Sequence, residues 1–154
     1  MELKETFVSR QEIFHGRIVD LRVDTVRLPN GHLTTREVID HPGGVAVVAI
    51  DENDNVLTVK QYRYAFQTVL EEIPAGKLER GEDPAAAARR ELYEETGAEL
   101  FMLSRVCLYS VTADGRTDYG MLYFAEIDML GELPESEIAE RRLFELLPEA
   151  ERLT

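Results

Sequence analysis

Residues 76–98 read GKLERGEDPAAAARRELYEETGA, and this stretch predicts a loop followed by one helix. Asp83 is a typical N-cap residue, Pro84 suits the first helical turn, and four alanines with the highest helix propensity follow. Gly97 can end the helix because glycine readily adopts the left-handed conformation. We expect the helix to dock on a sheet through an apolar stripe of three residues, Ala85, Ala88 and Leu92.

The same helix carries three glutamates close together. Glu91 and Glu95 are four residues apart and share one face, with Glu94 at its edge. Like charges at this spacing destabilise a helix, so they need a compensating charge. A hard divalent cation, Mg²⁺ or Mn²⁺, would supply it, because it binds carboxylate oxygens together with phosphate oxygens and water. Arg90, four residues before Glu94, can orient that side chain, and the loop before the helix is favourable to anions.

An ordinary interpretation also exists, because glutamate-rich helices are usually solvated faces with ion pairs. The distant Gly76 and Glu82 argue against it here. The stretch fits the pattern G-x5-E-x7-R-E-U-x-E-E-x-G-U, where U is bulky or apolar, and seven fixed identities arise by chance on the order of 10⁻⁵ times in such a chain. The matching residues are Gly76, Glu82, Arg90, Glu91, Leu92, Glu94, Glu95, Gly97 and Ala98.

This pattern resembles the signature of the Nudix hydrolases, which cleave diphosphate linkages. The resemblance implies an α+β fold, a Nudix-like α/β/α sandwich with a mixed sheet and an N-terminal antiparallel strand region. Residues 71–76 (EEIPAG) and residues 61–63 (QYR) are similar to segments of the ADP-ribose pyrophosphatase branch. By this likeness the enzyme converts ADP-ribose to AMP and ribose 5-phosphate, with Mg²⁺ or Mn²⁺ as cofactor.

Patterning over the rest of the chain predicts strands. Alternation of apolar and polar residues on both sides of Pro29-Asn30-Gly31 indicates a hairpin, and residues 43–50 (GGVAVVAI) are typical of a buried strand. Further strands are expected at 56–66, 101–111 and 120–127, with a polar loop between the last two and a short final helix around 148–153. We expect residues 1–43 to be a strand-rich region of the same unit and residues 44–154 to be the Nudix domain, with two or three helices in all.

Composition limits the partners. The 154 residues carry a net charge of −13, which argues against nucleic acid as a partner because phosphate contacts need clustered Lys and Arg. The longest apolar run, residues 45–50, is too short to cross a membrane, and we find no signal peptide. The single cysteine, Cys107, makes a cytoplasmic location the default, and its apolar surroundings predict a buried structural thiol.

The resemblance also implies roles for individual residues. Glu91, Glu94 and Glu95 would bind the metal together with the carbonyl oxygen of Ala75. Arg63 would contact the substrate. A surface ion pair is the alternative interpretation of Arg63.

Other implied roles lie outside the signature. Arg36 and Glu37 match a pair that touches the nucleotide from the N-terminal region. In this branch that region builds a homodimer. The simpler interpretation is that both residues are exposed charges on a strand. A glutamate in a late loop would act as base or extra ligand. Glu137 is the first candidate for this role, ahead of Glu140 and Glu135. The other possible base is a signature glutamate, Glu94. Asp114 and Asp118 are candidates for contacts with the ribose or with metal-bound water.

One departure leaves the substrate open. The branch usually carries a proline sixteen residues beyond the last glycine of the signature, and this chain has Ala113 there. A pyrophosphatase for another nucleotide sugar or a dinucleotide is therefore the nearest alternative. A non-catalytic, ADP-ribose-sensing Nudix domain is a second alternative. The presence of all four signature carboxylates argues against it.

Overall fold

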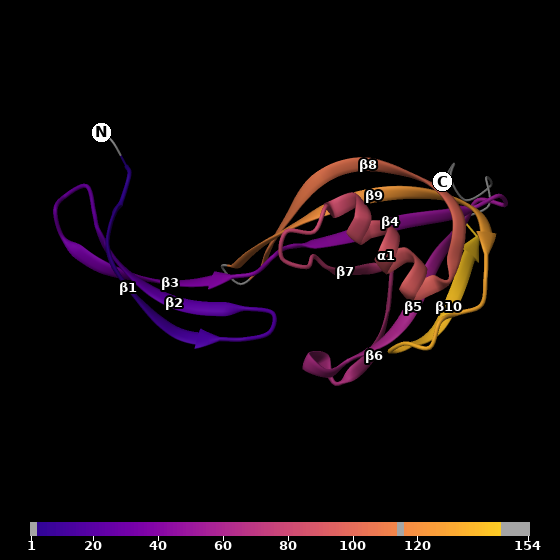
Figure 1. Cartoon of the computed structure of the whole chain (residues 1–154), viewed down its shortest axis with the longest axis horizontal. Coiled ribbons are helices and arrows are strands. Elements are labelled where there is room, and N and C mark those ends of the chain that lie inside the picture. Colours follow the sequence, from indigo (N-terminus) through magenta and orange to yellow (C-terminus); the bar gives the residue numbers. More distant parts are fainter. Residues whose placement is uncertain (1–2, 114–115, 146–154) are drawn as a thin grey trace, which may run out of the picture. The chain divides into compact units, whose positions relative to one another are not determined.

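The computed structural model describes residues 3–113 and 116–145 (Figure 1). Its contacts divide the chain into two compact units, Met1–Pro42 and Gly43–Thr154. Among the described residues, no helix has both the length and the apolar character needed to cross a bilayer.

The first unit is a three-stranded antiparallel sheet in the order β1-β2-β3, formed by β1 (Thr6–His15), β2 (Asp20–Arg27) and β3 (Leu33–Asp40). The hairpin expected around Gly31 is confirmed: this glycine has a φ of +88°, and the strands on either side pair in register. Arg10 and Asp24 face each other across β1 and β2, and their side chains form two hydrogen bonds of 2.8 and 3.0 Å.

The second unit contains a mixed seven-stranded sheet whose main order is β10-β5-β4-β9-β8, with β6 beside β5 and β7 beside β4. Only β4 and β9 run parallel among the pairs described. The elements are β4 (Gly44–Asp51), β5 (Asn55–Arg63), the 3-10 turn η1 (Tyr64–Phe66), β6 (Thr68–Glu72), β7 (Ala75–Lys77), α1 (Pro84–Thr96), β8 (Ala98–Ala113), β9 (Arg116–Leu130) and β10 (Ile138–Glu145). The expected mixed sheet is thus confirmed, whereas the helix expected at 148–153 lies outside the described residues.

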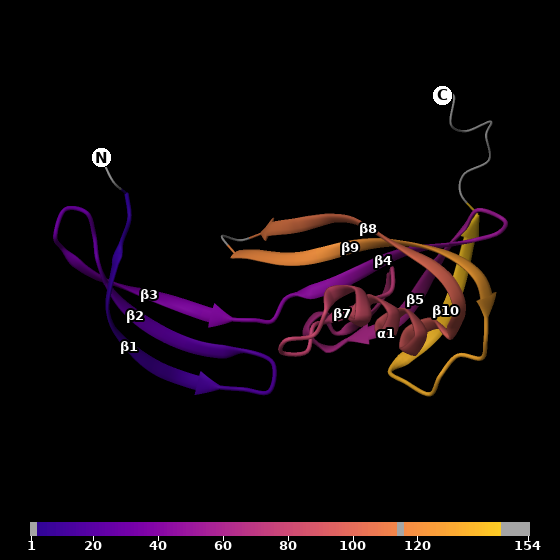
Figure 2. The same cartoon turned by 45° about the horizontal axis from the view of Figure 1, so that its top comes forward.

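Helix α1 covers one face of this sheet (Figure 2). Ala88 and Leu92 are fully buried and Ala85 packs beside them, so the expected apolar stripe is confirmed, with Ala87 as an additional member. On the strands the core is formed by Val45, Val47, Ala49, Leu57, Ala98, Tyr123, Ala125 and Ile127. The continuous apolar run of β4 follows from its central place between β5 and β9.

Two expectations for the β8–β9 region were wrong. The polar loop expected between these strands is mostly strand, because β8 continues to Ala113 and β9 begins at Arg116, with Thr112 paired to Thr117. Cys107 is exposed rather than buried. A bulge between Arg105 and Cys107 interrupts the alternation, and Cys107 lies opposite Leu122, on the sheet face away from the α1 core.

Candidate active site

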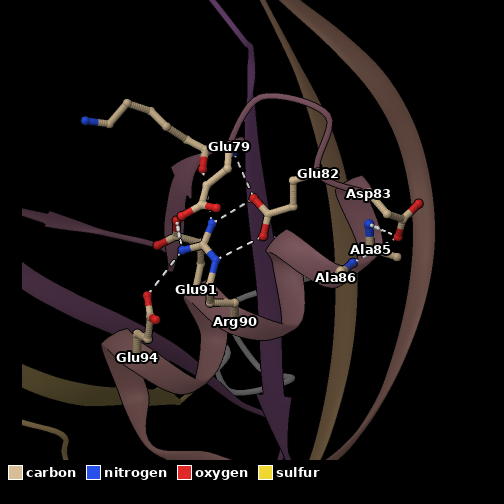
Figure 3. A network of polar contacts seen from close by, with 9 residues as sticks. Glu79, Glu82, Asp83, Ala85, Ala86, Arg90, Glu91 and Glu94 are labelled. Atoms are coloured by element: carbon tan, nitrogen blue, oxygen red, sulfur yellow. Dashed lines mark hydrogen bonds and ion pairs between the residues drawn. The ribbon is translucent and has the colours of Figure 1, made fainter. Parts of the chain in front are cut away.

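The site is built on the loop before α1 and on one face of the C-terminal half of this helix, which begins and ends as its sequence predicts. The Asp83 carboxylate accepts hydrogen bonds from the backbone N–H groups of Ala85 and Ala86 at 3.1 and 3.0 Å (Figure 3). Gly97 ends the helix in the left-handed conformation, with a φ of +72°, and its N–H donates to the Tyr93 carbonyl. These caps fix which turn of the helix meets β7.

Arg90 holds the loop and the helix together. Its guanidinium donates two hydrogen bonds of 3.0 Å to Glu82, one of 2.7 Å to Glu91 and one of 3.2 Å to Glu94 (Figure 3). A further bond of 3.2 Å reaches the Lys77 carbonyl oxygen. The expected contact with Glu94 is confirmed, but Glu82 is the partner that raises the pKa of Arg90 most.

Gly76 lies against the carboxylate of Glu91. A Cβ atom on Gly76 would overlap the carboxylate carbon and both oxygens of Glu91. The backbone at this point is tied to the sheet, because Gly76 pairs with Val45 across β7 and β4. The first glycine of the signature therefore leaves the space in which the Glu91 carboxylate lies beside the backbone.

Glu95 lies one turn further along and meets the neighbouring residue of the same strand. The Ala75 N–H donates to Glu95 Oε2 at 3.0 Å. Burial, opposed by this hydrogen bond and reinforced by the charge of Glu91, raises the pKa of Glu95 to about 7. Two carboxylates thus flank residues 75–76, and burial keeps the Glu95 carboxyl protonated to a higher pH than an ordinary glutamate.

Arg63, at the end of β5, forms an ion pair with Glu72 at the end of β6. Its Nε lies 3.1 and 3.3 Å from the two oxygens of Glu72, and its Nη2 lies 2.5 Å from Oε2. The hydrogen bond with Glu72 raises the pKa of Arg63 most, and the charges of Glu95 and Glu137 also raise it. Glu137 also lies next to Ile138, which pairs with Gln61 on the same strand as Arg63.

The donor set fits a hard divalent cation. Glu91 and Glu95 offer carboxylate oxygens beside one stretch of backbone, in a cradle that a side chain on Gly76 would fill. Glu94 turns to Arg90 and remains about half exposed. Within the described residues, no three acidic, histidine or cysteine side chains already converge on a single metal position. The expected ligand set of Ala75, Glu91, Glu94 and Glu95 stays a prediction.

The remaining candidates are distributed over both units. Arg36 and Glu37 lie on β3 of the first unit, where Arg36 pairs with Glu5 at 2.5 Å. Glu137 is exposed just before β10, and Glu140 binds Lys60 and Arg142 at 3.1 and 2.9 Å, which leaves it less available as a base. Glu135 is exposed; Asp114 and the side chain of Asp118 lie outside the described residues.

Two residues had no assigned role from the sequence. Glu72 stands within the quoted EEIPAG segment, but only the pairing of β5 with β6 reveals that it binds Arg63. Gln61, the first residue of QYR, is 3% exposed, and its Oε1 has no hydrogen-bond partner in the described part of the chain. Gln61 lies on the same face of β5 as Leu57, Val59 and Arg63, and this face meets the core.

Comparison with known proteins identifies the family. The NUDIX domain model matches residues 40–151, and that of the nucleoside diphosphate sugar hydrolase N-terminal domain matches residues 5–39. The chain belongs to the Nudix family. The expectation of a Nudix hydrolase is thereby confirmed, and members of this family generally use divalent metal cations.

Two relatives match most of this Nudix chain. The ADP-ribose pyrophosphatase of Bacillus subtilis is 37% identical over 142 residues, covering 90% of this chain and 77% of the relative. The methanol dehydrogenase activator of Bacillus methanolicus is 42% identical over 123 residues, covering 80% of this chain and 66% of the relative. This chain therefore spans about two thirds to three quarters of their lengths.

A solved structure supports the fold. An ADP compounds hydrolase matches 99% of this chain with a TM-score of 0.71 at 17% identity, and the match covers 85% of that chain. The expected Nudix-like α+β fold is confirmed by this likeness.

Proposed function

We propose that this Nudix hydrolase cleaves the diphosphate linkage of ADP-ribose to give AMP and ribose 5-phosphate. The observation that carries the proposal is the pair of carboxylates, Glu91 and Glu95, held beside residues 75–76 with Arg63 close to Glu95. Carboxylates bind a cation and arginine binds phosphate, so the two together suit a substrate bearing adjacent phosphates. The relative from Bacillus subtilis, named for activity on ADP-ribose, supports the choice of substrate.

The cation is proposed to be Mg²⁺ or Mn²⁺, held by Glu91 and Glu95 with Glu94 and the Ala75 carbonyl as further ligands. When bound, such an ion draws charge from the diphosphate and lowers the pKa of a coordinated water. Arg90 keeps Glu91 and Glu94 in reach of the site, and its bonds to Glu82 and the Lys77 carbonyl tie that arrangement to the loop.

The chain's own residues then bind the substrate and move the proton. Arg63 donates hydrogen bonds to a phosphate, and Arg36 and Glu37 contact the nucleotide. Glu137 takes the proton from the attacking water, with Glu94 as the alternative base. Support for Glu137 comes from its exposure and from its charge acting on Arg63.

The test is a substrate panel with Mg²⁺ and with Mn²⁺, read by mass spectrometry. It includes ADP-ribose, ADP-glucose, a diadenosine diphosphate and FAD. We expect AMP and ribose 5-phosphate from ADP-ribose at a kcat/KM well above that for the other compounds. Faster hydrolysis of ADP-glucose or the dinucleotide would move the assignment to the nucleotide-sugar or dinucleotide alternative, and no product from any of them would favour a sensing domain.

The Glu95→Gln variant accompanies the panel. It keeps the size and the hydrogen-bond acceptor for Ala75 but removes a charged cation ligand, so kcat should fall by about 10³-fold or more. Circular dichroism and the melting temperature should show an intact fold. Full activity in a folded Glu95→Gln protein would overturn the proposed site.

We also propose that two copies associate through the first unit and that the protein works in the cytoplasm. All ten residues of β1 are exposed, and exposed apolar side chains recur over the unit: Phe7, Val8, Ile13, Phe14, Ile18, Leu33 and Ile39. Such a surface is typical of a contact between proteins. Light scattering of the full chain should give a dimer mass, and Ile39→Lys should shift it toward the monomer.

A further inference from the structure

The pair formed by Arg63 and Glu72 differs from an ordinary surface ion pair. Three hydrogen-bonding contacts, at 2.5, 3.1 and 3.3 Å, join one edge of the guanidinium to one carboxylate. Both side chains are about one-third exposed, and they come from adjacent strands paired through Gln61 and Leu70. A planar guanidinium gripped along one edge loses its freedom to rotate, so the direction of its other edge is fixed.

The opposite edge of Arg63 remains available. Among the described residues, its Nη1 makes no hydrogen bond, and Arg63 forms no ion pair with Glu95 or Glu137 although the charges of both act on it. An arginine without Glu72 would be drawn to one of these two carboxylates by simple attraction. Such a new pair would neutralise a group that the proposed reaction needs for the cation or for the proton.

We propose that Glu72 is a positioning residue that holds Arg63 by one edge, directs its free N–H groups to a substrate phosphate, and keeps it from pairing with Glu95 or Glu137. The proposal rests on the proposed hydrolase function of the same site. Glu72 touches neither the substrate nor the reacting atoms; its charge also raises the pKa of Glu95, but its part in substrate binding is played through Arg63. Its loss therefore weakens substrate binding while the fold stays intact.

The matched pair of variants is Glu72→Gln and Glu71→Gln. Glu71 is the preceding residue on β6 and points to the opposite face, where it accepts a hydrogen bond of 2.9 Å from Thr58 and pairs with Arg142. Each substitution removes one charge from the same strand. We expect Glu72→Gln to lower kcat/KM at least tenfold, chiefly through KM, and Glu71→Gln to change it less than twofold, with similar melting temperatures.

A double-mutant cycle separates positioning from a general structural effect. Once Arg63 is replaced by alanine, adding Glu72→Gln should raise KM no further, because Glu72 takes part in substrate binding through Arg63. Arg63→Lys gives a second measure, since lysine keeps the charge but cannot form the edge-on pair. In that background, adding Glu72→Gln should change kcat/KM less than twofold.

The outcomes distinguish the two proposals. The cycle is run on whichever panel substrate the wild-type protein hydrolyses fastest. An active wild type whose Glu72→Gln variant behaves like Glu71→Gln, or whose double variant shows additive losses, overturns the positioning role alone. A wild type that hydrolyses no diphosphate overturns the proposed function, and the positioning role with it.

Discussion

Two arginines in the second unit are surrounded by glutamates, but in opposite ways. Arg90 is saturated: Glu82, Glu91, Glu94 and a backbone carbonyl accept hydrogen bonds from all three of its nitrogen atoms. Arg63 is bound along one edge only, by Glu72. Both lie beside the same helix face, so the difference lies in how much hydrogen-bonding capacity each arginine has left.

The difference separates a structural role from a binding role. A saturated guanidinium has no donor to offer a substrate, and its loss would leave three carboxylates close together without a counter-charge. A half-bound guanidinium is held in place and still has donors for a phosphate. The region around Arg90 therefore shapes the proposed cation site, whereas the β5–β6 region around Arg63 is the proposed place for the substrate.

Among the changes that test this comparison, Gly76→Ala should have the largest effect on activity because it acts on the carboxylate that Arg90 helps to hold. The added methyl group would overlap Glu91, and one of the two must move. A displaced ligand costs about 100-fold in rate or more. We expect kcat to fall by at least that factor at saturating Mg²⁺, while the melting temperature changes little, as measured in parallel by steady-state kinetics and calorimetry.

Gly81→Ala is the control for losing a glycine from the same loop. Gly81 has a φ of +81° and open space around its Cα, so alanine there is strained without meeting a neighbour. It should cost about 1–2 kcal/mol of stability but leave kcat within twofold of wild type. A loss of activity in Gly81→Ala as large as that in Gly76→Ala would mean that loop stability, and not the place of Glu91, limits the rate.

Glutamine substitutions of the two arginines test the comparison directly. In metal-free buffer, Arg90→Gln should lower the free energy of unfolding by about 2 kcal/mol, because it removes several charged hydrogen bonds and leaves Glu82 and Glu91, which are 16% and 13% exposed, without their counter-charge. Arg63→Gln should lower it by less than about 1 kcal/mol, since its single ion pair is partly exposed. Urea denaturation measures both. Equal losses would contradict the division into a structural and a binding arginine.

The signature region could be predicted from sequence because its determinants are local. Asp83, the alanines and Gly97 set the ends of α1 whatever the rest of the chain does, and the structure has the helix at Pro84–Thr96. The spacing of Glu91 and Glu95 follows from the helix alone. Hydrogen bonding to Glu94 was likewise predictable from its distance of four residues to Arg90.

The binding region could not be predicted in the same way because its contacts cross between strands. Glu72 meets Arg63 only in the observed register of β5 and β6, and Glu137 comes near Arg63 because Ile138 pairs with Gln61. No spacing within one segment encodes either contact. The prediction that Cys107 is buried was wrong for a related reason. One bulge changes which face of the sheet a residue occupies, and the alternation of apolar and polar residues in the sequence does not reveal the bulge.

The smallest predicted effect concerns acid stability and arises from Glu82. Hydrogen bonds from Arg90, and then from the Glu79 N–H, hold the pKa of Glu82 below its ordinary value of 4.5. A carboxyl group whose pKa is lower in the folded state stabilises the protein above its unfolded pKa, and this stabilisation is lost as the pH falls through the folded value. Glu82→Gln should therefore be less stable than wild type by a constant amount above about pH 5, and the difference should shrink in more acidic buffer.

The same substitution in the Arg90→Gln background identifies the cause. Without Arg90, the main source of the lowered pKa is gone, so Glu82→Gln should change the acid branch of the stability curve much less than it does in the wild type. Urea denaturation between pH 3 and 7 in metal-free buffer gives the four curves. If Glu82→Gln shifted the curve of unfolding free energy against pH equally in both backgrounds, Glu82 would stabilise the loop independently of Arg90. The hydrogen bonds between Glu82 and Arg90 would then contribute no stability.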